Sequence, residues 1–303
     1  MKYITRKSAA TAALAVAATL PSLASAQSNV TVYGVVDAGY AYASSDRSAG
    51  SSANFNGINA GLLGGSRIGF RGEENLGDGL KALFVLEYGS LGVDTNTGIT
   101  GSRQSWVGLR DAKLGTVALG RQYAPGYAAS GRNNAFGGST RQSPLNRLTS
   151  TGGNSITGDE QARVNNSISY ASPKWGGFSV NAIYGFGENN GGNNGVSSGG
   201  DGLFGAGLNY ANGPLNLDFV FQQRRGYTGT SNAVTGIGNR VRTTASGDDV
   251  NEWAILGSYD LKLVKLFASY QVQDDKNGTS GTEGGNKVWA VSASVPVSGN
   301  GSV

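Results

Sequence analysis

Short segments in which apolar and polar residues alternate fill most of this chain. Residues 264–273 place apolar side chains on one face of an extended strand and polar ones on the other, with Phe267 as the exception. Residues 80–87 and 289–295 follow the same period of two. Because successive side chains of a strand point to opposite faces, these segments predict strands with one apolar face.

The chain divides into about twelve such strands, separated by connections that alternate in length. The expected strands lie near residues 29–43, 65–72, 80–90, 103–110, 116–123, 163–171, 178–187, 203–211, 215–225, 251–259, 263–273 and 287–297. Tight turns with Gly, Pro, Asn or Asp lie near residues 73–79, 111–115, 172–177, 212–214 and 260–262. Long connections lie near residues 44–64, 91–102, 124–162, 188–202, 226–250 and 274–285. The alternation predicts an all-β fold, an up-and-down antiparallel sheet with tight turns at one end and no helix longer than a few turns.

The first 26 residues have the pattern of a secretory signal peptide. Lys2, Arg6 and Lys7 precede an apolar stretch, and Ala24-Ser25-Ala26 suits a cleavage site. The competing interpretation is an ordinary N-terminal helix. Cleavage of the signal peptide would remove the basic residues Lys2, Arg6 and Lys7. The 24 basic residues of the chain would then fall to 21 against 20 acidic residues, a net charge of +1. The basicity of the whole chain is therefore no argument for nucleic-acid binding, and we expect none.

The rest of the chain contains no apolar run of about 18 residues, so the sequence predicts no membrane-spanning helix. A transmembrane β-barrel would show none either, because its strands only alternate. Aromatic residues such as Tyr33, Trp106 and Tyr259 gather near strand ends, as they do at membrane interfaces. Tyr and Trp also favour strands in general. Together with the signal pattern and the loop alternation, they favour a transmembrane β-barrel.

The residue types that are absent limit the chemistry. The chain has 50 Gly and one Met but no His and no Cys. A Ser-His-Asp or Cys-His mechanism needs an imidazole base, and tight zinc or iron sites need His or Cys ligands. We therefore expect no enzyme, no cofactor and no metal, although a lysine or carboxylate mechanism stays formally open. Asp248-Asp249 and Asp274-Asp275 could bind calcium weakly, but solvated loop charge explains them better.

Five motifs in order resemble the general trimeric porins of Gram-negative outer membranes. They are residues 30–37 (VTVYGVVD), 66–82 (SRIGFRGEENLGDGLKA), 106–109 (WVGL), 114–123 (LGTVALGRQY) and 166–170 (NSISY). The resemblance covers essentially all of residues 27–297. It implies an outer-membrane location, a barrel of about 16 strands that leaves an aqueous channel, and a homotrimer in contact with outer-membrane lipid.

The resemblance also implies that the third long loop, here residues 124–162, folds into the lumen as a constriction. It makes residues 27–303 one barrel domain. The family ends on a strand with a terminal aromatic residue, whereas residues 298–303 have the composition of a turn. The sequence contains about twelve strands, whereas the family has about 16, so we expect a C-terminally truncated product or a fragment.

The family lines one wall of its constriction with arginines, and Arg67, Arg103 and Arg163 fall at those motif positions. Tyr123 matches a tyrosine at the base of the lumen loop. Strand alternation places Arg71 beside Arg67 on the inward face, and Glu87 on the inward face of its own strand. The expected pore wall is therefore Arg67, Arg71, Glu87, Arg103, Tyr123 and Arg163. The alternative is that each arginine is a solvated rim charge or half of a surface ion pair.

The expected lumen loop carries Arg132, Arg141 and Arg147, and its acids Asp159 and Glu160 come only near its end. A ring of like charge sets ion selectivity by its field, so the sequence predicts an anion preference that weakens with rising salt. Glu87 would offset part of the field if it pairs with an arginine. The predicted function is passive diffusion of small hydrophilic solutes and inorganic anions. The alternatives are an adhesin or other binding protein, either secreted or in the outer membrane, and, less favoured, a barrel enzyme.

Overall fold

The computed structural model describes residues 29–45, 53–89, 91–96, 98–137, 143, 145, 146, 156, 163–186, 202–227, 248–275, 286–298, 301 and 302. The expected signal peptide, residues 1–26, lies outside this part of the chain. So do Arg141, Arg147, Asp159 and Glu160 of the expected lumen loop.

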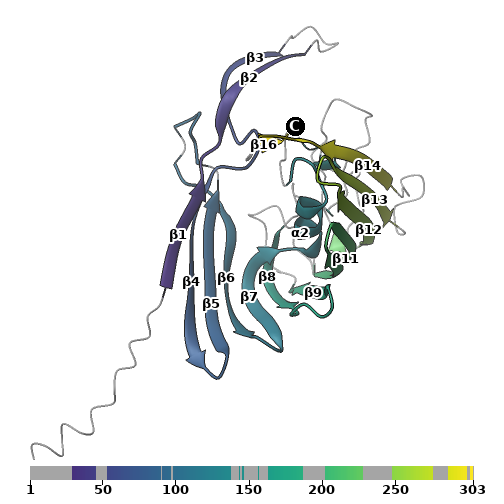
Figure 1. The fold of residues 1–303 in the computed structure, drawn as a ribbon. Helices are drawn as coiled ribbons and strands as arrows, with labels where there is room; N and C mark the ends of the chain where they lie inside the picture. Colours follow the sequence, from purple (N-terminus) through teal and green to yellow (C-terminus); the bar gives the residue numbers. More distant parts are fainter. Residues whose placement is uncertain are drawn as a thin grey trace, which may run out of the picture.

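The main feature is one curved antiparallel sheet of twelve strands (Figure 1). Its strands, in spatial order, are β1 (Asn29–Val35), β4 (Arg67–Gly77), β5 (Leu80–Gly89), β6 (Ser102–Asp111), β7 (Gly115–Tyr123), β8 (Arg163–Ala171), β9 (Phe178–Gly185), β10 (Leu203–Asn212), β11 (Leu215–Tyr227), β12 (Asp248–Asp260), β13 (Lys265–Asp275) and β14 (Asn286–Ser294). From β4 onwards each strand pairs with the next one along the chain. The up-and-down prediction is confirmed. Within the described residues, β1 and β14 form the two edges of the sheet and do not pair with each other.

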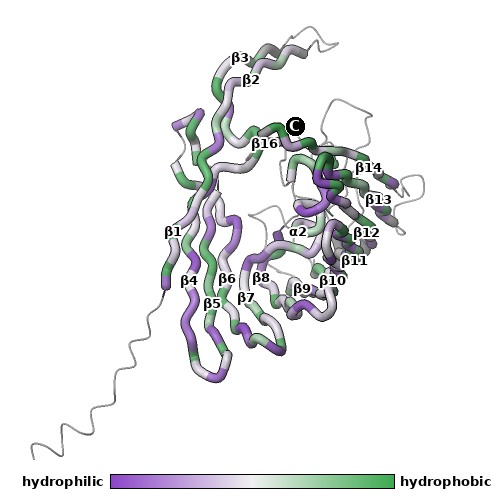
Figure 2. Tube along the Cα trace, in the orientation of Figure 1, coloured by the Kyte–Doolittle hydropathy of each residue, from purple (hydrophilic) through white to green (hydrophobic). Residues whose placement is uncertain are grey.

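The burial pattern of the sheet is inverted relative to a water-soluble protein. On β12, the outward Ile255 is 52% exposed, whereas the inward Glu252 is 1% exposed. On β13, the outward Leu266 is 45% exposed and the inward Gln271 is 1% exposed. Figure 2 shows apolar and polar positions alternating along the strands. An apolar outer face and a polar inner face are what a barrel wall in lipid requires.

The first expected strand, residues 29–43, is interrupted at Val36 and Asp37. The chain continues as β2 (Ala38–Ser45), which pairs with β3 (Ala53–Ala60) in a separate hairpin. Most of β2 falls within the expected strand, whereas β3 falls within the expected long loop near residues 44–64. The Asp37 carboxylate accepts backbone N–H groups of Leu62, Leu63 and Gly64 at 2.6–3.1 Å. Burial raises the pKa of the Asp37 carboxyl, but these three donors outweigh it and hold the pKa below its ordinary value. The turn that they form redirects the chain out of the sheet.

The remaining described elements are short. The helix α2 (Pro125–Arg132) follows β7 and lies against the concave face of the sheet (Figure 1). A small hairpin joins β15 (Pro296–Ser298) and β16 (Gly301–Ser302). The β4–β5 turn is tighter than the expected 73–79, because Gly77 and Gly79 take positive φ angles of 96° and 86° and close it around Asp78. No helix among the described residues is long and apolar enough to cross a membrane.

We predict that a charge on the outer face destabilises the protein in lipid. Val107, in the middle of β6, is 60% exposed on that face. Val107→Arg is expected to lower the free energy of unfolding by about 2–4 kcal/mol, because the guanidinium would enter hydrocarbon. Urea titration in phospholipid vesicles measures this, with Val107→Leu as the apolar control. Equal stability of the two variants would show that this face does not contact lipid.

Candidate functional site

One buried carboxylate, that of Glu87 on β5, joins four side chains on the inner face of the sheet. Its Oε1 accepts hydrogen bonds from Arg103 Nε at 2.7 Å and from the Tyr123 hydroxyl at 3.1 Å. Its Oε2 accepts the Tyr33 hydroxyl at 3.0 Å and lies 3.7 Å from Arg67 Nε. The Glu87 side chain is 6% exposed, so these partners stabilise an ionised group that burial alone would disfavour.

Strand pairing explains how these residues meet. Gly69 of β4 stands opposite Glu87, so Arg67 and Arg71, two positions away on either side, share the inward face with Glu87. Arg103 lies at a register shift between β5 and β6, which gives it a position that simple alternation does not define. Gly89 makes room for it, since a Cβ there would lie 2.7 Å from Arg103 Cδ.

Aromatic rings extend this cluster towards the lumen loop. Tyr123 stacks on Tyr127 of α2, with ring centroids 3.8 Å apart and an interplanar angle of 2°. The Arg163 guanidinium lies 5.2 Å from the centroid of Tyr123, and Arg103 Nη2 donates to the Tyr123 hydroxyl at 2.9 Å. The Nε atom of Arg163 is buried and has no hydrogen-bond partner among the described residues. Arg71 lies over Tyr33, 5.4 Å from its ring centroid.

The structure thus brings together all six residues expected at the pore wall, directly or through one shared neighbour: Arg67, Arg71, Glu87, Arg103, Tyr123 and Arg163. Glu87 pairs with both Arg67 and Arg103, so its charge offsets part of theirs. Arg67 and Arg103 are therefore partners in a buried network and not isolated rim charges.

The described parts of the expected lumen loop lie on the same inner face. The Gly126 N–H donates to Gln222 Oε1 on β11 at 3.1 Å, and Gln271 Nε2 on β13 donates to the carbonyl oxygen of Ile156 at 3.1 Å. Pro125 packs over Gly205 of β10, where a Cβ would lie 3.1 Å from the proline ring. The described parts of the loop therefore cover the inside of β10–β13.

The C-terminal end of α2 is held by an ion pair that sequence reasoning missed. Arg132 donates from Nη2 and Nε to the two carboxylate oxygens of Asp218, at 2.6 and 3.3 Å. Asn133 and Asn216 donate to the same carboxylate at 2.7 and 3.0 Å. Arg132 was expected to add an uncompensated positive charge, but Asp218 neutralises it. The only sequence signal was an acid on the inward face of the strand at 215–225.

Tyr33, Tyr127 and Arg121 also belong to the site and were not predicted as such. Arg121 donates from Nε to the carbonyl oxygen of Ser102 at 2.9 Å and from Nη1 to Asn165 Oδ1. The sequence placed Tyr33 in a family motif and among the aromatic residues near strand ends, whereas the structure directs its hydroxyl to Glu87 on the inner face. Tyr127 carried no signal, because only the folded loop places it on Tyr123.

An apolar outer wall, a polar inner wall and a loop on the inner wall define a transmembrane β-barrel channel. The chain belongs to the Gram-negative porin family, whose model matches residues 10–303. It is 32% identical over 281 residues to outer membrane porin protein 32 of Delftia acidovorans, covering 92% of this chain and 74% of that protein. It is 30% identical to an outer membrane porin protein of Bordetella pertussis, over 85% of this chain and 67% of that one.

A solved structure agrees with this assignment. The anion-selective porin from Comamonas acidovorans matches with a TM-score of 0.71 and 30% sequence identity, covering 91% of this chain and 76% of that one. The protein is accordingly an outer-membrane porin.

We predict that Asp218 fixes α2 to the wall. Asp218→Asn keeps the size of the side chain but removes the charge that binds Arg132, so amide hydrogen exchange of residues 125–133 should rise about tenfold, as expected for one charge-assisted contact. Glu73→Gln is the matched control, because it breaks an exposed ion pair of 2.6 Å with Lys81 on β5, six strands away from β11 in the sheet. Unchanged exchange in the Asp218 variant would show that Gln222 and Tyr123 suffice to hold the helix.

Proposed function

We propose that this porin is an anion-preferring channel for passive diffusion of small hydrophilic solutes. The residues around Glu87 would form the positive wall of its narrowest part, and α2 with the rest of its loop would narrow the lumen opposite. Inorganic anions and small anionic solutes are the permeants that such a field favours.

The observation that supports this proposal is the excess of arginine over carboxylate side chains on one part of the inner wall. Arg67, Arg71, Arg103, Arg121 and Arg163 lie there, and Glu87 is the only carboxylate that pairs with any of them in the described part of the chain. Arginine stays protonated throughout the accessible pH range, so the field persists near neutrality.

The match to the anion-selective porin from Comamonas acidovorans supports the same proposal. A homotrimer in contact with outer-membrane lipid is part of it, since the resemblance to trimeric porins covers most of the chain. The adhesin alternative is weaker, because it assigns no role to a charged cluster on the inner face or to a loop held there.

Replacement of Arg103 should shift the selectivity towards cations. Arg103→Glu reverses one charge of the wall and places a second carboxylate beside Glu87, and Arg103→Gln removes the charge without that repulsion. The reversal potential under a potassium chloride gradient across a planar bilayer measures the ratio of chloride to potassium permeability. Lys113→Gln, on a tight turn, is the control. A cation preference of the unmodified channel, or no shift with either variant, would contradict the proposal.

Replacement of Glu87 should act in the opposite direction. Glu87→Gln keeps hydrogen-bonding atoms for Tyr33 and Arg103 but leaves the arginine charges uncompensated. The ratio of chloride to potassium permeability is expected to rise up to about fivefold at low salt, as for about 1 kcal/mol from a unit charge at close range in water. The rise should shrink as salt increases, because the Debye length falls to about 3 Å at 1 M. A rise that is independent of salt would indicate a change in pore width.

A further inference from the structure

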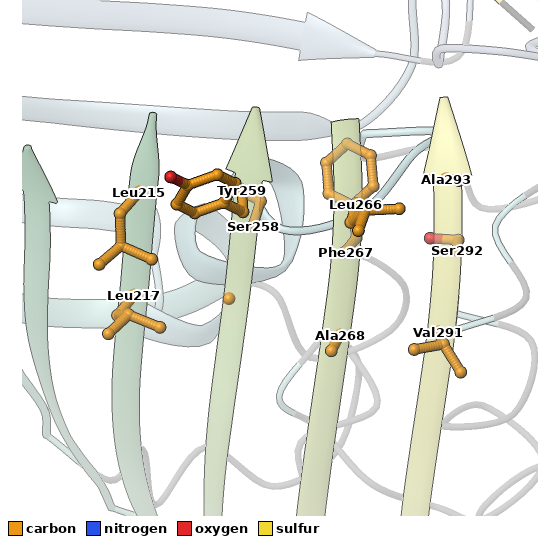
Figure 3. A pocket seen from close by; sticks show the side chains of 11 residues that line it. Leu215, Leu217, Ser258, Tyr259, Leu266, Phe267, Ala268, Val291, Ser292 and Ala293 are labelled. Atoms are coloured by element: carbon orange, nitrogen blue, oxygen red, sulfur yellow. The ribbon is translucent and has the colours of Figure 1, made fainter. Parts of the chain in front are cut away.

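An apolar groove lies on the outer face of the sheet, across β11–β14 (Figure 3). Its volume is about 610 Å³. Strand pairing builds it from two rows of outward side chains. Leu215, Tyr259, Leu266 and Ala293 stand side by side in the row next to the tight turns, and Leu217, Gly257, Ala268 and Val291 form the next row. The small residues Gly257 and Ala268 in the middle of the second row leave a depression between the larger side chains of Leu217 and Val291.

The β12–β13 turn borders this groove and carries an unusual pair of residues. Lys262 is exposed and forms no ion pair with the described residues, and the next residue, Leu263, is 82% exposed. Lys262 also has a φ of 69°, a conformation that glycine adopts without strain and lysine does not. An exposed cation and a highly exposed apolar side chain are therefore consecutive in the turn that joins the two central strands of the groove.

A second turn repeats the same arrangement. Residues 111–114 read Asp-Ala-Lys-Leu, and residues 260–263 read Asp-Leu-Lys-Leu. In each turn the aspartate accepts the backbone N–H of the lysine at 2.7 Å, which commits the carboxylate to the turn. Leu114 is 73% exposed, and with Leu263 it has the highest exposure among the large apolar side chains in the described residues. Only the turn at 260–263 borders the groove.

Lysine beside an exposed apolar residue suits the boundary between hydrocarbon and headgroups, where the apolar side chain enters lipid and the ammonium meets phosphate. Tight turns of such barrels face the periplasm. We propose that this groove binds one anionic phospholipid of the periplasmic leaflet, with an acyl chain between Leu217 and Val291 and the phosphate at Lys262. The site is outside the lumen, so it is independent of ion selectivity.

Native mass spectrometry of the full chain in detergent, titrated with phosphatidylglycerol, tests this. Lys262→Gln should weaken binding about fivefold, as expected for one lysine at an anionic surface. Ala268→Trp should abolish it by filling the groove from a position that already faces outward. Two variants are the matched controls. Lys113→Gln makes the same change in the turn at residues 111–114, and Ala82→Trp makes the same change on the outer face of β5. Both should bind phosphatidylglycerol as the unmodified chain does.

Three results would overturn the proposal. Equal binding by all four variants would mean that the groove holds no lipid. An equal loss with Lys113→Gln and Lys262→Gln would indicate a general charge effect of the turns. If Ala268→Trp changes the oligomeric state and not lipid binding, the groove is a contact between copies of the chain. Phosphatidylcholine, which has the same acyl chains but no net charge, should bind more weakly than phosphatidylglycerol to the unmodified chain and to the two controls, but not to Lys262→Gln.

Discussion

The constraint on which this structure depends is that lipid offers no hydrogen-bond partners. Every backbone N–H and C=O group within a membrane must be paired inside the protein. The antiparallel sheet achieves this for β4–β13, each of which has a neighbouring strand on both sides. Side chains then divide by strand alternation, with apolar groups facing lipid and polar groups facing inward. The exposed Ile255 and the buried Glu252, three positions apart on β12, show both consequences on one strand.

Polar groups collected on the inner face must find partners, and this requirement builds the site. Glu87 satisfies its two oxygens with Arg67, Arg103, Tyr33 and Tyr123, all from different strands. The Asp218 carboxylate likewise accepts hydrogen bonds from Arg132 and Asn133 at the end of α2. The wall and the loop are therefore one connected polar network, in which Tyr123 contacts both the Glu87 cluster and Tyr127. A change in the charge of the wall is expected to affect the loop that narrows the lumen as well.

The outer face has its own organisation. Large apolar side chains cover most of it, but small residues at Gly257 and Ala268 lower it on two adjacent strands beside a turn that presents Lys262. Within one wall, the inner face arranges arginines for small anions and the outer face arranges one lysine and a groove for an anionic lipid. The two faces use the same preference for negative charge in very different dielectric surroundings.

The sequence alone determined the strands from β4 to β14, the alternation of turns and loops between them, and the inward direction of Arg67, Arg71 and Glu87, because a period of two is a local property. It could not place Arg103, whose direction depends on a register shift against β5. It also missed Asp218 and Tyr127, since their partners lie on segments far apart in the chain, as with Arg132, 86 residues from Asp218. Asp37 broke an expected strand for the same reason, because its carboxylate binds backbone groups of residues 62–64. Alternation fixes which face a side chain takes, whereas only the folded sheet decides which charges on that face meet.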